Sequence, residues 1–290
     1  MLPDGFVFSQ SSLQDYVDCA RRFQLRYLEH CRWPAPEMAD ALEFEQFVQR
    51  GQAFHRLLRQ FYSGVPREAL ERVARADPDL ARWWQNYRNA SPQDLPQEVC
   101  ETEVALSVAI PSSDLGRSSA SGTVQRYRLE ARYDLLAGEP GKRWIIVDWK
   151  TGQHRSSRSW LQKHLQTRIY PYVLVQAGAL FNNGVPIAPQ QVEMVYWFAE
   201  FPAQPERFSY NEEQFAADAA FLCDLVHEIA VRAKEVFPKT EQRHLCRYCV
   251  YRSLCWTDVE TGLLAEAEDV EGVTAALEEI DLENIAPIPF

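Results

Sequence analysis

Two periods of hydrophobic side chains divide this chain into a helical N-terminal part and a later part that mixes strands with helices. Apolar residues recur every three or four positions over 11–30 and again over Leu42–Tyr62, which predicts two helices, with shorter ones over 66–89. Serines suit a cap for the first helix, and Gly64 ends the second. Gly51 lies inside the second helix, where glycine costs about 1 kcal/mol relative to alanine, so we expect another segment to pack closely there.

The period changes to two after residue 100. Alternating apolar side chains over 104–110 and 127–135 predict two strands, separated by a Ser- and Gly-rich loop at Pro111–Gly122. A turn at Gly138–Gly141 leads into WIIVDWK (144–150), so the three strands are expected to form an antiparallel meander. The pattern then predicts a helix at about 159–180, a strand at Val192–Phe201 and a helix at Glu212–Lys234.

Composition narrows the class of protein. With 290 residues, 46% of them hydrophobic, the chain can bury a substantial core. Its longest apolar runs, such as Trp144–Val147 and Tyr170–Val175, are too short for a membrane span, and the first residues lack a secretory pattern. Seven cysteines, an odd number, argue against a disulfide framework. We therefore expect reduced thiols and a cytoplasmic protein.

The net charge of −11 is unevenly distributed. Residues 257–290 carry ten carboxylates and no Lys or Arg, which leaves 31 acidic and 30 basic residues for the rest. A nearly neutral body can still present a basic groove, so the overall charge does not exclude nucleic acid as a partner. The acidic tail is expected to be a disordered solubilising segment, or else to dock on the protein's own cleft or on a partner.

Candidate chemistry gathers at the predicted meander. Asp148 and Lys150 are two apart in a strand and share a face, and pairing through the turn would bring Asp134 close to Asp148. Two carboxylates can hold a divalent cation that activates water, and a lysine can stabilise developing negative charge. An isolated Asp-x-Lys is more often a surface ion pair, and that alternative is open on this pattern alone.

A second cluster of candidate ligands is formed by cysteines. Cys246, Cys249 and Cys255 follow a C-x2-C-x5-C spacing, which is typical of a soft metal or an iron–sulfur cluster but lacks a fourth ligand. Structural zinc is the alternative, although zinc ribbons usually supply two paired hooks. The candidates for the missing ligand are Cys19, Cys31, Cys100, Cys223 and His244.

Together these motifs resemble a known family. The chain has Asp134 and, after thirteen intervening residues, the run Asp148-Trp149-Lys150 at the end of an apolar strand. This pattern resembles the PD-(D/E)XK nuclease superfamily, and specifically its RecB-like branch. Further matching segments, in the family's order, are FSQSSLQDYVDCARRFQLRYL, RGQAFHRLL, LQTRIYPY and the C-x2-C-x5-C run. The last resembles the iron–sulfur subgroup, which includes CRISPR-associated RecB-like exonucleases and the AddB nuclease domain.

The resemblance implies a fold and a domain arrangement. It implies an α/β (α+β) protein with a restriction-endonuclease-like core, in which a central mixed sheet with an antiparallel meander is flanked by helices. A helical N-terminal region and a C-terminal iron–sulfur clasp would complete it. The nuclease domain would span 1–257, with a helical insertion at about 30–95 and the cluster segment at 244–256. The acidic tail, 258–290, has no counterpart.

The resemblance also assigns roles. His55, Asp134, Asp148 and the carbonyl of Trp149 would bind Mg²⁺ or Mn²⁺, and Lys150 would be the catalytic lysine. From the residues alone, a histidine beside an apolar stripe is more often a core residue than a ligand. By the same resemblance, Gln166 and Tyr170 would position the substrate or Lys150, and Glu103 would add a further carboxylate. DNA would run past five arginines: Arg21, Arg22, Arg126, Arg128 and Arg132. A 4Fe–4S cluster would be held by four cysteines: Cys19, Cys246, Cys249 and Cys255.

Some positions depart from the family pattern. Ala131 stands three residues before Asp134, where glycine is usual, and no proline follows Cys19. Pro171 directly follows Tyr170 inside the expected helix, which predicts a kink or a helix start there.

The function implied is a metal-dependent DNA nuclease, expected to be a single-strand exonuclease in DNA repair, recombination or CRISPR adaptation, with adaptation or helicase proteins as partners. The alternative is a catalytically silent nuclease fold that binds DNA or scaffolds a larger complex. Retention of His55, Asp134, Asp148 and Lys150 favours the enzyme, because a silent subunit has no chemical need for all four.

Overall fold

The computed structural model describes residues 2–3, 5–31, 41–110, 127–232, 235–256, 259–260 and 262, with only the backbone of 41–45. Among these residues, no helix is both long and apolar enough to cross a membrane. Three sequence expectations fall outside the described residues: the loop at Pro111–Gly122, the position of Arg126, and nearly all of the acidic tail, 258–290.

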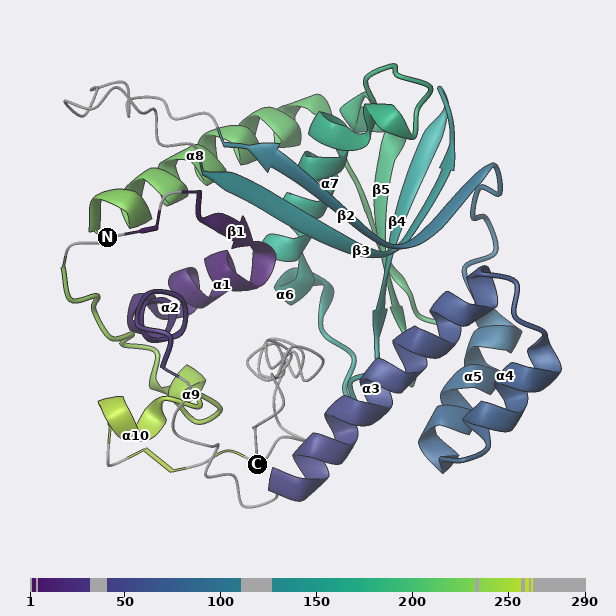
Figure 1. Cartoon of the computed structure of the whole chain (residues 1–290), viewed down its shortest axis with the longest axis horizontal. Coiled ribbons are helices and arrows are strands. Elements are labelled where there is room, and N and C mark those ends of the chain that lie inside the picture. The colour runs from purple at the N-terminus through teal and green to yellow at the C-terminus, as the bar shows by residue number, and fades with distance from the viewer. Residues whose placement is uncertain are drawn as a thin grey trace, which may run out of the picture.

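A six-stranded mixed sheet forms the centre of the described structure (Figure 1). Its path runs β1-β3-β4-β5-β6, and β2 pairs with β3 off this path. The β2–β3, β3–β4 and β5–β6 pairs are antiparallel, whereas β1–β3 and β4–β5 are parallel. The strands are β1 Val7–Ser9, β2 Val99–Ala109, β3 Arg128–Glu139, β4 Arg143–Lys150, β5 Val192–Phe198 and β6 Glu206–Ser209.

The predicted antiparallel meander is confirmed as β2, β3 and β4, and the mixed sheet flanked by helices is confirmed as well. The sequence pattern missed β1 and β6, which have only three and four residues. Strands this short do not repeat often enough to establish a period of two.

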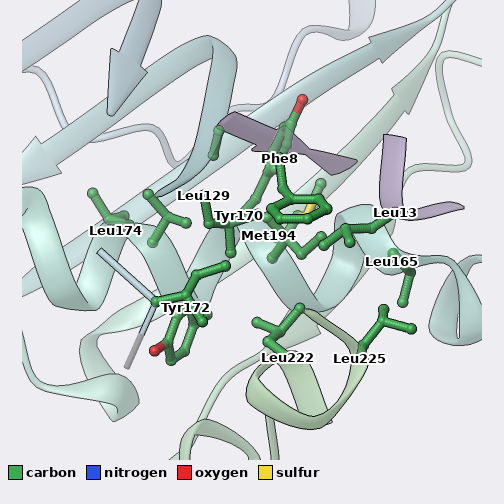
Figure 2. Packing of buried hydrophobic residues seen from close by; sticks show 14 of the residues in the cluster. Phe8, Leu13, Leu129, Leu165, Tyr170, Tyr172, Leu174, Met194, Leu222 and Leu225 are labelled. Atoms are coloured by element: carbon green, nitrogen blue, oxygen red, sulfur yellow. The ribbon is translucent and has the colours of Figure 1, made fainter. Parts of the chain in front are cut away.

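One face of the sheet packs against α1 Gln10–Asp18, α7 Leu165–Ala177 and α8 Glu212–Arg232. Figure 2 shows this packing, in which Leu129 of β3, Met194 of β5 and Leu174 of α7 are completely buried. The other face packs against α3 Ala41–Tyr62, α4 Arg67–Ala74 and α5 Pro78–Ala90.

Side-chain alternation along β3 changes at Asp134. Leu129, Ala131 and Tyr133 belong to the first core, whereas Leu135 and Ala137 belong to the second. Strict alternation would keep all five on one face. The change leaves Asp134 at the border between the two halves of the strand.

The helices predicted over 11–30 and at about 159–180 are each broken at a single residue. Cys19 is extended (φ −160°, ψ 103°) and separates α1 from α2 Ala20–Phe23 and the π-helical turn Gln24–Leu28. His164 is also extended and separates α6 Arg158–Lys163 from α7. The predicted helix start at Tyr170 is wrong, because α7 begins at Leu165 and continues through Pro171. Tight packing against both β3 and α8 stabilises α7 despite the missing N–H.

Short elements complete the fold. They are the 3₁₀ turns Gly178–Leu180 and Pro189–Gln191, and the helices α9 Arg243–Cys246 and α10 Arg252–Cys255.

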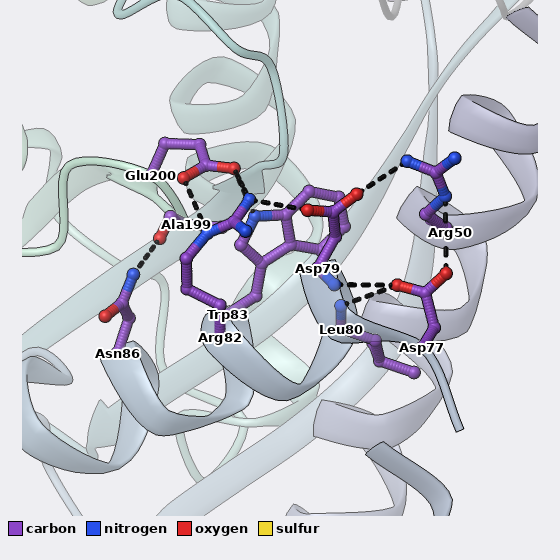
Figure 3. A network of polar contacts seen from close by, with 9 residues as sticks. All are labelled: Arg50, Asp77, Asp79, Leu80, Arg82, Trp83, Asn86, Ala199 and Glu200. Carbon is purple, nitrogen blue, oxygen red and sulfur yellow. Dashed lines mark hydrogen bonds and ion pairs between the residues drawn. The ribbon is translucent and has the colours of Figure 1, made fainter. Parts of the chain in front are cut away.

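A polar network anchors α5 to both α3 and the sheet (Figure 3). Trp83 Nε1 donates to Glu200 Oε1 (2.7 Å), and Asn86 Nδ2 donates to the Ala199 carbonyl (2.8 Å), just after β5. From α3, Arg50 Nη1 contacts Asp79 Oδ2 at 2.7 Å. These contacts set the position of α3 relative to the end of β4, where the candidate site lies.

Gly51 lets α3 pass close to the chain after β4. A Cβ built on it would lie 3.0 Å from Thr151 Oγ1, which confirms the predicted close approach. We expect Gly51→Val to lower the free energy of unfolding by about 1–3 kcal/mol, because the added methyl groups must displace Thr151 or α3. Urea denaturation measures the change.

Two further variants make that test specific. Gln52→Val places the same side chain at an exposed position of α3 and should cost clearly less. The double variant Gly51→Val/Thr151→Ala should recover part of the loss. Equal losses for Gly51→Val and Gln52→Val would show that helix propensity, and not the contact, explains the effect.

Candidate active site

The two aspartates meet where the β3–β4 ladder ends. Leu135 pairs with Val147, so Asp134 and Asp148 occupy the next opposed positions. Asp134 Oδ2 accepts a hydrogen bond from the Trp149 N–H at 2.9 Å. The register set by the Gly138–Gly141 turn therefore brings the two carboxyl groups together.

His55 reaches this point from α3. Its Nδ1 lies 3.2 Å from Asp134 Oδ1, and its Nε2 lies 2.9 Å from the Trp149 carbonyl oxygen. Each ring nitrogen thus faces an oxygen acceptor. The ring also packs edge-on against Trp149. His55 faces the site, although sequence pattern alone favoured a core residue.

A second group of polar side chains surrounds Asp148, which is 5% exposed. Lys150 Nζ lies 2.9 Å from Asp148 Oδ2 and donates to Gln166 Oε1 at 3.2 Å. Gln166 Nε2 donates to Asp148 Oδ1, and the Gln166 side chain also hydrogen-bonds the Tyr170 hydroxyl. Gln166 and Tyr170 are four apart in α7 and share one face. Together these contacts hold Lys150 in place.

The two aspartates differ in their electrostatics. Burial opposes ionisation of Asp134, but the His55 ring, the Trp149 N–H and Lys150 outweigh it and lower the pKa of this carboxyl. At Asp148 burial dominates and raises the pKa, opposed by Lys150 and reinforced by the neighbouring charge of Asp134. A cation bound beside both groups would favour the charged form of each.

Glu103 of β2 adds a third carboxylate. Glu103, His55 and Asp134 each have one potential ligand atom, and these three atoms lie within 4.8 Å of one another. Its backbone has φ 55°, which costs a non-glycine residue about 1–2 kcal/mol. Burial and the nearby charge of Asp134 raise the pKa of Glu103, while His55, Arg59 and Arg132 act in the opposite direction.

These donors fit a divalent cation. Carboxylate and carbonyl oxygens are the ligands that Mg²⁺ and Mn²⁺ prefer, and His55 adds one nitrogen. Asp134, Glu103 and the Trp149 carbonyl all lie around the His55 ring. The residues present therefore match the metal chemistry of the motif.

Two exposed arginines flank the cation ligands. Arg59 follows His55 by one helical turn, and Arg132 lies two residues before Asp134 in β3. Both act electrostatically on Glu103. Neither side chain has a hydrogen bond or ion pair with another described residue. Arg59 was missed by the sequence analysis, although its spacing from His55 was a usable signal.

The N-terminal arginines lie in a different environment. Arg21 contacts Glu29 at 2.7 Å, and Arg22 contacts Asp15 and Asp18, each at 2.7 Å. Arg22 is partly buried and lines a pocket with the clustered cysteines. Its guanidinium is therefore occupied by carboxylates of α1 and serves to hold that pocket.

Four cysteines from opposite ends of the chain line this pocket: Cys19, Cys246, Cys249 and Cys255. Cys19 acts electrostatically on each of the other three, so it lies near all of them. Burial raises the pKa of Cys249 to about 11. Of the remaining candidates, Cys31, Cys100, Cys223 and His244 do not line the pocket.

Hydrogen bonds from Gln24 also join the two ends of the chain. Gln24 Oε1 accepts from the Phe237 N–H at 2.8 Å, and Gln24 Nε2 donates to the Glu235 carbonyl at 3.0 Å. Arg21 N–H donates to the Pro238 carbonyl at 3.0 Å. The cysteine segment is thus docked beside α2 by more than its cysteines, which the sequence analysis did not foresee.

The model of the PD-(D/E)XK nuclease superfamily matches residues 7–256 of this chain. The chain belongs to this superfamily. That membership confirms the superfamily resemblance seen in the sequence, and the mixed sheet flanked by helices is the restriction-endonuclease-like fold of PD-(D/E)XK proteins. The matched range includes Asp134 and the Asp148-Trp149-Lys150 run.

Solved structures also match the chain, at low sequence identity. SSO0001 has 14% sequence identity and a TM-score of 0.40, with 90% of each chain covered. A protein from Eubacterium rectale, provisionally assigned as an exonuclease, has 10% identity and a TM-score of 0.41, covering 84% of this chain and 88% of its own. No curated protein sequence matches the chain.

Proposed function

We propose that this PD-(D/E)XK protein is a Mg²⁺- or Mn²⁺-dependent deoxyribonuclease that acts as an exonuclease on single-stranded ends. The observation that carries the proposal is that His55 and Asp134 both contact the Trp149 backbone, between Asp148 and Lys150, which form an ion pair with each other. The four come from α3, β3 and β4, and a structural ion pair would need only two of them. This convergence favours an enzyme over a silent DNA-binding subunit.

Each residue has a distinct proposed role. A bound Mg²⁺ or Mn²⁺ supplies Lewis-acid activation of a phosphodiester and of the attacking water. His55, Asp134, Asp148 and the Trp149 carbonyl would hold it. The Lys150 ammonium orients the water and stabilises negative charge that develops on the phosphate. Gln166 contacts both Lys150 and Asp148 and holds them side by side, and a hydrogen bond with the Tyr170 hydroxyl positions Gln166.

The proposed path of DNA crosses the open face of β2 and β3 beside α3. Arg128 and Arg132 lie on that face, and Arg59 borders it. Arg128 is held by Ser107, to whose hydroxyl its Nε donates at 2.9 Å. Arg21 lies near the cysteine pocket and would contact DNA only at a distance from the metal site.

Arg59→Ala and Arg132→Ala should each weaken DNA binding about five- to tenfold and reduce the slope of log K against log salt by about one. The reason is that each removes one phosphate contact and the counterion released with it. Fluorescence anisotropy in EDTA measures binding without hydrolysis. Arg75→Ala, which removes a 75% exposed arginine paired with Glu71 on α4, is the control. An equal loss for Arg75→Ala would remove the proposed path.

We also propose that Cys19, Cys246, Cys249 and Cys255 hold a 4Fe–4S cluster, which places the protein in the RecB-like iron–sulfur branch. The shared pocket and its donor set of four thiols support this. The cluster would be structural, and the nuclease domain would span 1–257 with the acidic segment 258–290 beyond it. Membership of this branch would imply a cytoplasmic protein. Its pathway would be repair, recombination or CRISPR adaptation, with helicase or adaptation proteins as partners.

A nuclease assay tests the activity. Linear single-stranded, linear duplex and circular single-stranded DNA, each incubated with Mg²⁺, Mn²⁺ or EDTA, separate exonuclease from endonuclease action. Release of mononucleotides or short products from linear single strands only, and only with metal, is expected. Cleavage of circles would overturn the exonuclease assignment, and inactivity on all forms would favour the silent subunit.

A further inference from the structure

Glu103 has a backbone conformation that is unusual for a residue inside a β-strand. The pairs Thr102–Leu135 and Val104–Tyr133 flank it in one continuous antiparallel register. Its φ of 55° nevertheless lies in the left-handed region, which a strand residue other than glycine avoids. The other described non-glycine residues with positive φ, His30 and Asn183, lie outside the strands. Glu103 alone among them interrupts a strand.

Nothing within the described chain compensates for this strain through the side chain. No hydrogen bond or ion pair joins the Glu103 carboxylate to another described residue. The nearest charged partners, Arg59 and Arg132, act on it only electrostatically. Strained residues of this kind persist where the surrounding structure enforces them, and they concentrate at functional sites.

The unusual backbone directs the carboxylate toward the metal ligands. Glu103 lies opposite Asp134 in the register, and its carboxylate oxygen lies within 4.8 Å of ligand atoms of both Asp134 and His55. Asp148 is held instead by Lys150 and Gln166. His55 of α3 and Glu103 of β2 therefore form, with Asp134, a set of donors that does not include Asp148.

We infer that Glu103 is a direct ligand of a divalent cation, together with His55 and Asp134, and that β2 is strained in order to present it. This inference rests on the proposed nuclease function and adds to it a carboxylate from the neighbouring strand. The cation it binds is a hard divalent ion of the Mg²⁺ or Mn²⁺ class, because two of its three donors are carboxylates.

The inference predicts opposite effects on metal affinity and on stability. Glu103→Gln keeps the shape of the side chain but removes its charge, and it should raise the dissociation constant for Mn²⁺ at least about tenfold. Glu103→Gly also removes the ligand, but glycine adopts positive φ without strain. In metal-free buffer its thermal midpoint should therefore equal or exceed that of the wild type.

The experiment is a Mn²⁺ titration of the intact chain, with free Mn²⁺ followed by electron paramagnetic resonance and with thermal midpoints measured with and without the ion. Glu101→Gln is the matched control, since Glu101 is exposed on the same strand two residues away. The wild type and Glu101→Gln should gain the same stabilisation from Mn²⁺. Both Glu103 variants should gain clearly less, because stabilisation by a ligand scales with its affinity.

The outcomes separate this inference from the proposed function. Wild-type Mn²⁺ binding and metal-dependent hydrolysis with unchanged affinity in Glu103→Gln would overturn only the role of Glu103. Weak binding in Glu103→Gly but normal binding in Glu103→Gln would also overturn it, because the backbone and not the carboxylate would then be responsible. A wild type that neither binds Mn²⁺ nor cleaves DNA would remove the proposed function itself.

Discussion

Replacing Asp148 with asparagine is expected to reduce DNA hydrolysis about a thousandfold while leaving the fold intact. Asparagine has nearly the same shape and keeps an oxygen for Gln166, but it removes a negative charge beside Lys150 and Asp134. Loss of one preorganised electrostatic group at a reacting centre typically costs 10² to 10³ in rate, about 3–4 kcal/mol. Single-turnover hydrolysis of labelled linear DNA measures the effect.

The stability of the variant makes the result interpretable. Asparagine leaves the mostly buried Lys150 ammonium without its carboxylate partner, so the thermal midpoint should fall, and activity is compared at a temperature where both proteins are folded. Asp224→Asn, an exposed position on α8 far along the chain, is the matched control and should retain full activity. Hydrolysis by Asp148→Asn at the wild-type rate would mean that the site around Asp134, Asp148 and Lys150 does not carry the chemistry.

Replacing Cys246 with alanine is expected to remove the visible absorbance of the protein and to lower its thermal midpoint by about 10–20 °C. A cluster held by Cys19 and Cys246 closes a loop of more than 200 residues, and such a link is worth about 5 kcal/mol in chain entropy. Gln24 still binds the Glu235–Phe237 segment, so the chain should loosen at this end and not unfold completely. Anaerobic absorbance, iron and sulfide analysis and calorimetry measure both effects.

Cys31→Ala provides the control, because Cys31 lies near the same segment but does not line the pocket. It should keep the iron content and the thermal midpoint of the wild type. A colourless wild type with one equivalent of zinc would replace the cluster by a zinc site. Full iron in Cys19→Ala would show that another residue is the fourth ligand.

Local patterns predicted the centre of the site well. The period of two over residues 127–135 and 144–150, joined by a turn with two glycines, specified an antiparallel pair and hence the meeting of Asp134 with Asp148. Both strands and the turn are contiguous in the chain, so their register depends only on neighbouring residues. Gly51 in α3 likewise signalled a close contact before its partner was known, and that partner is Thr151.

Other predictions failed because packing outweighed local preference. Of the two alternatives given for Pro171, the helix start is wrong, because α7 begins at Leu165 and includes the proline. The helix predicted over 11–30 is interrupted at Cys19, whose extended backbone directs the chain into the pocket. In each case contacts with segments distant in the chain decide the local conformation, and a period cannot report such contacts.

The sequence by itself determined the order of the elements, the carboxylates and lysine of the meander, and the spacing of the clustered cysteines. Spacing alone left open which side chains from separate segments meet, and the family resemblance implied that His55 joins the Trp149 carbonyl and that Cys19 joins the C-terminal cysteines. The tertiary structure brings both groups together and adds the pairing of Arg22 with the aspartates of α1, which the sequence did not indicate. It also decided that Glu103 takes a strained conformation opposite Asp134. The physical reason is that periodicity records which face of one element is buried, whereas a site depends on how several buried faces are packed together.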